Sequence, residues 1–165
     1  MSGTLEPLHS VLNVPEDESS PIELFHLSFR DFLLDKKRCP DPRFWIDEKT
    51  AHNDLFIRCF ELMSEHLMRD MCSLRLPGAL ASEIKKSKVE KCLFFDVQYA
   101  CRYWVEHLQR GNFDPCNYGQ IHKFLEEHFL HWLEALSLMG KMSEAVLMIT
   151  ALQSILTVSD FMPSL

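Results

Sequence analysis

Residues 96–111 have the sequence DVQYACRYWVEHLQRG, which carries the clearest structural pattern in the chain. Its apolar side chains recur at i, i+3, i+4, i+7, i+8 and i+11, so they share one face of a helix. They are Val97, Ala100, Cys101, Trp104, Val105 and Leu108. Asp96 stands where an N-cap is expected, and Gly111 where a helix stops. The sequence therefore predicts an amphipathic helix here, packed against other helices.

A long helix is predicted before this stretch, capped by Asp47 and reaching about Arg69. Its apolar stripe consists of Leu55, Cys59, Leu62, Met63, His66 and Leu67. Pro77-Gly78 marks a turn, and a short, weak helix is expected from about residue 79 to 85.

Two further helices are predicted after residues 96–111. The first begins near Tyr118 and ends at Gly140, with the stripe Ile121, Phe124, Leu125, His128, Trp132, Leu136 and Met139. The second is capped by Ser143. The side chains expected to face the core are those of Ala145, Val146, Ile149, Leu152 and Ile155. Because isolated short helices are marginal, they must stack on one another, and the short connections favour antiparallel α–α packing.

The N-terminal part predicts a β-hairpin. Two short apolar runs, residues 8–14 and 22–27, flank the polar connection 15–21. Ser28 can then cap a short helix that carries Phe29, Phe32 and Leu33 on one side. The predicted fold is mainly α, with an N-terminal β-hairpin followed by an antiparallel helical array.

The composition excludes several classes of function. The chain has 165 residues, 47% of them hydrophobic, and a net charge of −7, so a core can form but no basic face for nucleic acid is expected. The short basic clusters, residues 36–38 and 85–88, are interpreted as solvated loops. No segment is long and apolar enough to span a membrane, and residues 1–12 lack the features of a signal peptide. We expect a cytoplasmic protein without membrane or nucleic-acid partners.

Six cysteines occur, and none forms a CxxC pair. Cys59 and Cys101 fall within apolar stripes, where a free thiol behaves as a small hydrophobe. We therefore expect reduced thiols and no disulfide framework.

No catalytic or metal motif is complete. The nearest candidate for a phosphate-binding loop is Gly140-Lys141, but Ala135 replaces its first glycine and Met142 its hydroxyl residue. Cys101 and His107 lack a third group for nucleophilic catalysis.

A histidine-rich helix offers the best metal candidate. His122, His128 and His131 lie near Glu127 and Glu134 in the sequence. They lack a zinc-ligand spacing such as HExxH, and His128 falls on the apolar stripe. A hydrolase or metalloenzyme built on this cluster is the least favoured hypothesis, and we expect no enzyme and no bound metal.

Several stretches in one order carry a more specific signal. They are residues 8–12 (LHSVL), 25–34 (FHLSFRDFLL), 44–47 (FWID), 72–78 (CSLRLPG), 97–105 (VQYACRYWV) and 124–138 (FLEEHFLHWLEALSL). The second resembles the end of the winged-helix subdomain in NACHT-type signal-transduction NTPases, where NOD-like receptors carry a similar His-Leu-Ser-Phe-Gln-Glu-Phe-Phe run. Together they look closest to the fungal NACHT–WD-repeat branch of HET-E-like vegetative incompatibility proteins.

The resemblance implies an arrangement of domains. Residues 1–38 would be the end of a winged-helix subdomain, and residues 39–165 a helical linker or arm. A NACHT NTPase core would precede them and WD repeats would follow, as partners in cis or in trans. The family's winged-helix histidine contacts the β-phosphate of bound ADP, and His26 is the matching position. ADP or ATP is expected only in a full-length relative, not in this chain.

Two functional hypotheses follow from the resemblance. In the first, the chain is a non-catalytic scaffold or relay that couples a nucleotide-switched core to a C-terminal repeat sensor. In the second, Met1 is the natural start, and the chain is a stand-alone truncated adaptor or decoy that binds full-length homologues through the same apolar surfaces.

Overall fold

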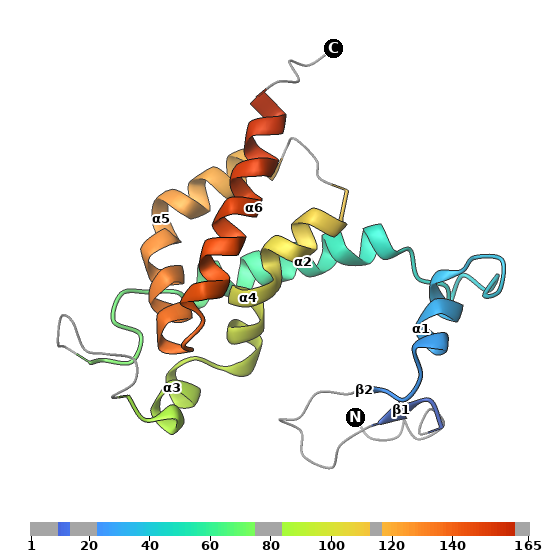
Figure 1. The fold of residues 1–165 in the computed structure, drawn as a ribbon, viewed down its shortest axis with the longest axis horizontal. Helices are drawn as coiled ribbons and strands as arrows, with labels where there is room; N and C mark the ends of the chain where they lie inside the picture. Colours follow the sequence, from blue (N-terminus) through green and yellow to red (C-terminus); the bar gives the residue numbers. More distant parts are fainter. Residues whose placement is uncertain (1–9, 14–22, 75–83, 113–116, 161–165) are drawn as a thin grey trace. The chain divides into compact units, whose positions relative to one another are not determined.

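The computed structural model describes residues 10–13, 23–74, 84–112 and 117–160, and two compact units divide the chain, residues 1–48 and 49–165. Six helices and one two-stranded antiparallel sheet are formed within the described residues (Figure 1). The predicted fold, mainly α with an N-terminal β-hairpin, is therefore confirmed. The polar connection 15–21, Cys116 and most of the helix expected at 79–85 lie outside the described residues.

The hairpin of the first unit is short. Strand β1 (Leu12–Asn13) pairs with β2 (Glu23–Leu24), and the Phe25 N–H extends the pairing by donating to the Val11 carbonyl at 3.0 Å. Helix α1 (Leu27–Leu34) follows directly. Its N-cap is His26, so the prediction that Ser28 caps this helix is wrong, and Ser28 lies inside the first turn.

The segment after α1 folds back on that helix. The backbone N–H of Ile46 donates to the Leu33 carbonyl at 2.9 Å, and the Trp45 indole N–H donates to the Leu34 carbonyl at 3.3 Å. The Lys36 ammonium lies 4.8 Å from the centre of the Trp45 ring, a cation–π geometry. These contacts fix the C-terminal end of α1 without a buried core residue of its own.

Helix α2 (Glu48–His66) begins directly after Asp47, as predicted, but ends before Arg69. The predicted core position Leu55 is exposed. Cys59, Met63 and Leu67 are buried as predicted, but the core face also contains the buried Phe56 and the partly buried Phe60. This set also fits helical spacing, and it packs two phenyl rings against the core, one buried and one partly buried, whereas the predicted stripe contains none.

The second unit is centred on α4, α5 and α6. Helix α4 (Phe95–Arg110) buries all six residues of the predicted stripe, and Gly111 is its C-cap. Its N-cap is Phe94, not Asp96, because the helix begins one residue before Asp96. The Asp96 carboxylate instead accepts the Val97 N–H at 2.8 Å.

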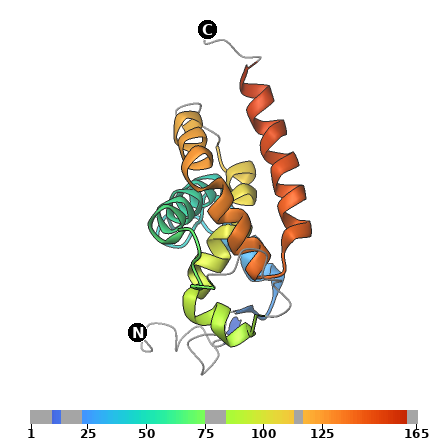
Figure 2. The same ribbon diagram turned by 90° about the vertical axis from the view of Figure 1, so that its left-hand side faces the viewer.

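Helix α5 (Asn117–Leu138) is followed by α6 (Met142–Asp160), which runs back alongside it in the opposite direction (Figures 1 and 2). Gly140 has φ +69°, a conformation that glycine adopts without a Cβ penalty. The N–H groups of Lys141 and Gly140 donate to the carbonyls of Leu136 and Ser137, which forms a Schellman motif. The predicted end of this helix at Gly140 is confirmed.

Helix α6 departs from its predicted orientation. Val146 was expected to face inward but is 63% exposed, whereas Met148 is buried. Ala145 and Leu152 are buried as predicted. Ser143 lies inside the helix rather than at its cap, since α6 starts at Met142. Almost every residue of this helix is uncharged, so several apolar stripes fit its sequence equally well.

Aromatic rings fill the core of the second unit. Trp104 of α4 is fully buried and makes edge contacts with Phe60 of α2 and with Phe124 and Trp132 of α5, at centroid distances of 5.5, 5.7 and 5.5 Å. The Trp132 indole N–H donates to the Cys101 carbonyl at 2.8 Å. Trp104 therefore joins three helices at one point.

The cysteines contradict one expectation. Cys72 and Cys92 form a disulfide, with their Cα atoms 5.4 Å apart. The expectation of no disulfide is therefore wrong for this pair, because a sequence separation of 20 residues gave no sign that the fold brings them together. Cys39, Cys59 and Cys101 are free and buried.

Helix α3 (Lys86–Cys92) ends at the second half-cystine. The basic cluster 85–88, interpreted as a solvated loop, therefore lies mostly in this helix. Of the helix expected at 79–85, only Ile84 and Lys85 are described, and both precede α3. Among the described helices, none has the length and apolar character of a membrane-spanning segment.

Candidate functional site

His26 lies at the junction of β2 and α1. Its backbone is extended, with φ −142° and ψ 129°, and its carbonyl accepts the Phe29 N–H at 3.1 Å, which starts the helix. The side chain is exposed. The hairpin and the first turn of α1 thus hold the imidazole at the surface of the first unit.

Ser28 contacts the imidazole directly. Its hydroxyl oxygen lies 3.2 Å from His26 Nδ1. If the hydroxyl donates to Nδ1 of a neutral ring, the ring proton resides on Nε2, and in the cationic ring both nitrogens are protonated. Among the described residues, His26 Nε2 has no hydrogen-bond partner. The contact can therefore leave an N–H donor for an external acceptor.

Apolar side chains surround this donor in the sequence. Phe25 is 60% exposed and Leu27 is 74% exposed, and Leu24 is exposed as well. Large apolar side chains exposed in neighbouring positions are typical of surfaces that another protein segment covers. The first unit therefore presents a polar ring between apolar neighbours.

The histidine-rich stretch of α5 is engaged in other contacts. His122 lies near Glu126 at 3.5 Å, and the His128 ring stacks on Phe124 at a centroid distance of 5.5 Å. Glu134 accepts the backbone N–H of Asp70 at 3.2 Å. Within the residues that the structure describes, no group of three or more His, Cys, Asp or Glu side chains is placed to hold a metal ion.

The buried thiols are poor nucleophiles. Burial raises the pKa of Cys101 to about 12 and that of Cys59 to about 11. Because the thiolate is the reactive form, both groups stay protonated near neutral pH. His107, considered as a base for Cys101, instead forms hydrogen bonds with two other side chains.

One partner, His52, lies on α2, and the other, Tyr99, lies on α4 with His107. His107 Nδ1 lies 2.8 Å from His52 Nδ1, and His107 Nε2 lies 2.9 Å from the Tyr99 hydroxyl. His107 is 6% exposed, and its pKa is lowered, first by burial and then by the neighbouring His52. From the sequence, His107 was considered only as a partner of Cys101, and its pairing with His52 and Tyr99 was not predicted, although its position three residues after Trp104 puts it at the edge of the apolar stripe.

Acid should weaken this network. Because the pKa of His107 is lower in the folded state than its ordinary value of 6.5, the unfolded chain binds more protons in the interval between the two values. Stability is therefore expected to be fully present above about pH 7 and to fall as the pH drops below 6.5 toward the folded-state pKa. Glu106 opposes the shift and Arg110 adds to it.

The measurement is urea unfolding of the wild-type chain and of His107→Gln between pH 5 and 7.5. Glutamine keeps hydrogen-bonding capacity but does not titrate, so the variant should lose part of the slope of stability against pH. The exposed His122→Gln serves as the control and should keep the wild-type slope. Parallel curves for wild type and His107→Gln would contradict the role given to His107.

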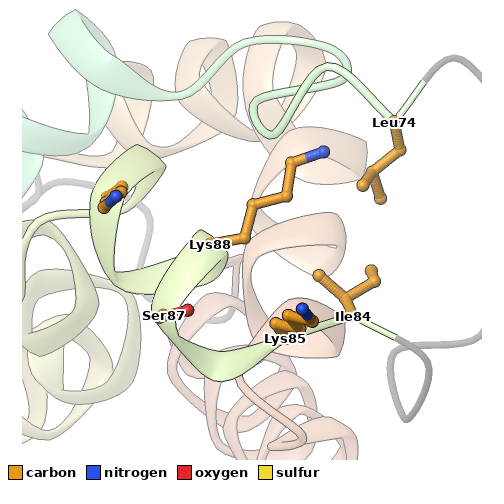
Figure 3. A pocket seen from close by; sticks show the side chains of 6 residues that line it. Leu74, Ile84, Lys85, Ser87 and Lys88 are labelled. Atoms are coloured by element: carbon orange, nitrogen blue, oxygen red, sulfur yellow. The ribbon is translucent and has the colours of Figure 1, made fainter.

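A hollow of about 380 Å³ opens beside α3 (Figure 3). Its lining residues are Leu74, Ile84, Lys85, Ser87, Lys88 and Lys91. Figure 3 shows Lys88 extending across the opening, with Leu74 and Ile84 facing it from the far side. No pattern in the sequence predicts this site, because its residues come from two segments, one with Leu74 and one from Ile84 to Lys91, that only the fold brings together.

Comparison with known proteins supports one relationship. HET-E-1, a vegetative incompatibility protein from Podospora anserina, is 32% identical to the chain over 149 residues. The match includes 79% of this chain but only 11% of HET-E-1, so the chain spans about a ninth of that relative. No family model and no solved structure matches the chain. The chain is therefore related to a part of a HET-E-like fungal vegetative incompatibility protein.

Proposed function

We propose that this chain is a non-catalytic, cytoplasmic relay segment of a NACHT-type signal-transduction protein. In this proposal the first unit contacts a nucleotide-switched NTPase core, and the helical second unit passes the state of that core to a C-terminal WD-repeat sensor. The similarity to HET-E-1 and the run at residues 25–34 support the proposal. The assignment of residues 1–38 to a winged helix and of 39–165 to a helical arm belongs to it.

The observation that carries the proposal is the geometry of His26. Its ring is exposed, Ser28 contacts Nδ1, and the flanking Phe25 and Leu27 are exposed. In the proposed complex, Ser28 donates to Nδ1, His26 Nε2–H donates to the β-phosphate of ADP, and the apolar neighbours pack against the core. ADP would thereby hold the resting state, because a ligand shifts a two-state equilibrium by its differential affinity.

The proposal predicts that His26→Ala weakens ADP binding. The experiment joins residues 1–165 to the NTPase core of a HET-E-like relative and measures ADP affinity by calorimetry. A hydrogen bond to a charged phosphate contributes about 1.5–3 kcal/mol, so the affinity should fall by roughly 10- to 100-fold. Ser28→Ala should cause a smaller loss, and Ser28→Thr, which retains the hydroxyl, should restore it.

The matched control is His122→Ala, which removes an exposed histidine from α5. It should leave the ADP affinity unchanged within about twofold, a difference of roughly 0.4 kcal/mol. An unchanged affinity in His26→Ala would remove the nucleotide-sensing role from this residue. The relay proposal would then rest on the helical unit alone.

The exposed apolar residues of the first unit also support the second candidate, an adaptor or decoy that binds full-length homologues in trans. The same surface of Phe25 and Leu27 would then be covered by the NTPase core of another chain. Co-purification of the 165-residue chain with a separately expressed core distinguishes the two, because an adaptor binds in trans and a relay requires covalent continuity.

A further inference from the structure

Three lysines around the hollow of Figure 3 concentrate positive charge in a chain whose net charge is −7. Among the described residues, Lys85, Lys88 and Lys91 form no ion pair. By contrast, Lys86 Nζ lies 3.7 Å from Glu90 Oε1, and Lys86 does not line the hollow. Unpaired positive charge beside apolar surface is complementary to a ligand that combines negative charge with an apolar group.

A disulfide and two hydrogen bonds hold the Leu74 side of the hollow near the end of α3. The disulfide joins Cys72, two residues before Leu74, to Cys92, which follows Lys91. The Asp70 carboxylate accepts the Leu74 N–H at 2.7 Å, and Glu134 of α5 accepts the Asp70 N–H at 3.2 Å. Two nearby acidic groups therefore accept backbone N–H groups in the turn that supports Leu74. A preformed site loses less entropy on binding.

The shape and chemistry of the hollow favour a peptide over other anions. Its lysines are exposed, so the hollow is open to solvent and suits a chain that crosses the surface. A volume of about 380 Å³ holds one large apolar side chain with adjoining backbone. Among the described residues that line the hollow there is no aromatic side chain for stacking on bases, which disfavours nucleic acid.

Lysine side chains can also bind carboxylates at varying positions along a flexible peptide. Its ammonium is a point charge on a mobile stem, whereas arginine fixes one planar, bidentate geometry. The methylene stems add apolar surface beside Leu74 and Ile84. We infer that the hollow binds an acidic peptide segment of a partner protein, with one large apolar side chain seated between Leu74 and Ile84 and flanking carboxylates held by Lys85, Lys88 and Lys91.

The test uses the 165-residue chain and a fluorescein-labelled peptide, Asp-Glu-Asp-Leu-Glu-Asp-Glu, in a fluorescence anisotropy titration. We expect saturable binding with a Kd below about 1 mM that weakens between 0.05 and 0.5 M salt, because screening reduces exposed charge interactions. Replacing the peptide's leucine with serine, or its carboxylates with amides, should each weaken binding severalfold.

Two variants of α3 provide the comparison. Lys88→Gln with Lys91→Gln should weaken binding by roughly tenfold, and Lys86→Gln should change it less than twofold. All three changes remove charge from exposed positions of one helix, and circular dichroism verifies that the fold is retained. Leu74→Ser tests the apolar contact and should also weaken binding.

Several results would overturn the inference. These are no peptide binding up to 1 mM, an equal effect of Lys86→Gln and of the double variant, or lysine-dependent binding of inorganic phosphate or phosphatidylserine vesicles in place of the peptide. The test requires no NTPase core, so it stands independently of the nucleotide-sensing proposal.

Discussion

Trp104→Ala is expected to lower the free energy of unfolding by about 3–5 kcal/mol, the largest effect of any single substitution considered. The side chain is fully buried and touches Phe60, Phe124 and Trp132 from two other helices. Truncation removes those contacts and leaves a cavity that three helices border, so the site cannot collapse easily. Since domains are typically stable by only 5–15 kcal/mol, much of the stability would be lost.

Urea unfolding followed by circular dichroism measures this loss. The neighbouring Tyr103→Ala is the control, because Tyr103 is only half-buried and packs against Tyr99 and the Arg102 guanidinium. Its cost should be nearer 1 kcal/mol. Trp104→Phe should retain part of the stability if the alanine variant does not fold. A smaller loss for Trp104→Ala than for Tyr103→Ala would show that Trp104 is not the centre of the core.

Removing the disulfide is the second large effect. In the chain-entropy account, a crosslink closing a loop of about 20 residues stabilises the folded state by roughly 3 kcal/mol. Replacing both Cys72 and Cys92 with alanine should lower the unfolding free energy by about that amount under oxidising conditions. The loop carries Leu74 and α3, so the loss should also loosen the hollow between them.

Reductant provides the control for this prediction. Dithiothreitol should lower the melting temperature of the wild-type chain but leave the double alanine variant unchanged. Thiol titration of the denatured wild-type chain should detect two more reactive groups after reduction than before it. Identical melting curves with and without reductant in the wild-type chain would contradict the disulfide.

The helices of the second unit were largely predictable because their periodicity is strong. All six residues of the stripe predicted for α4 are buried, and Gly111 and Gly140 end their helices. Periodicity fixes a face poorly when more than one stripe fits. The stripe predicted for α2 therefore included the exposed Leu55 and omitted Phe56 and Phe60, and Val146 of the almost uncharged α6 was predicted to face inward.

Contacts between segments far apart in the chain could not be predicted, because no local sequence pattern indicates them. The Cys72–Cys92 disulfide, the His52–His107 pair and the hollow of Leu74 and Ile84 each join residues from two separate segments. For His26, composition and spacing indicated nothing, and only the resemblance singled out this position. The structure adds its exposure and the Ser28 contact, which the sequence pattern does not specify.

The claim that residues 1–165 relay the state of a nucleotide-switched core is tested most directly by hydrogen–deuterium exchange. The chain is joined to the NTPase core of a HET-E-like relative and compared with ADP and with a non-hydrolysable ATP analogue bound. The account predicts different exchange rates in α1 and in helices of the second unit, because both would take different arrangements in the two states. Identical exchange throughout residues 23–160, with both nucleotides bound at saturation, would contradict it.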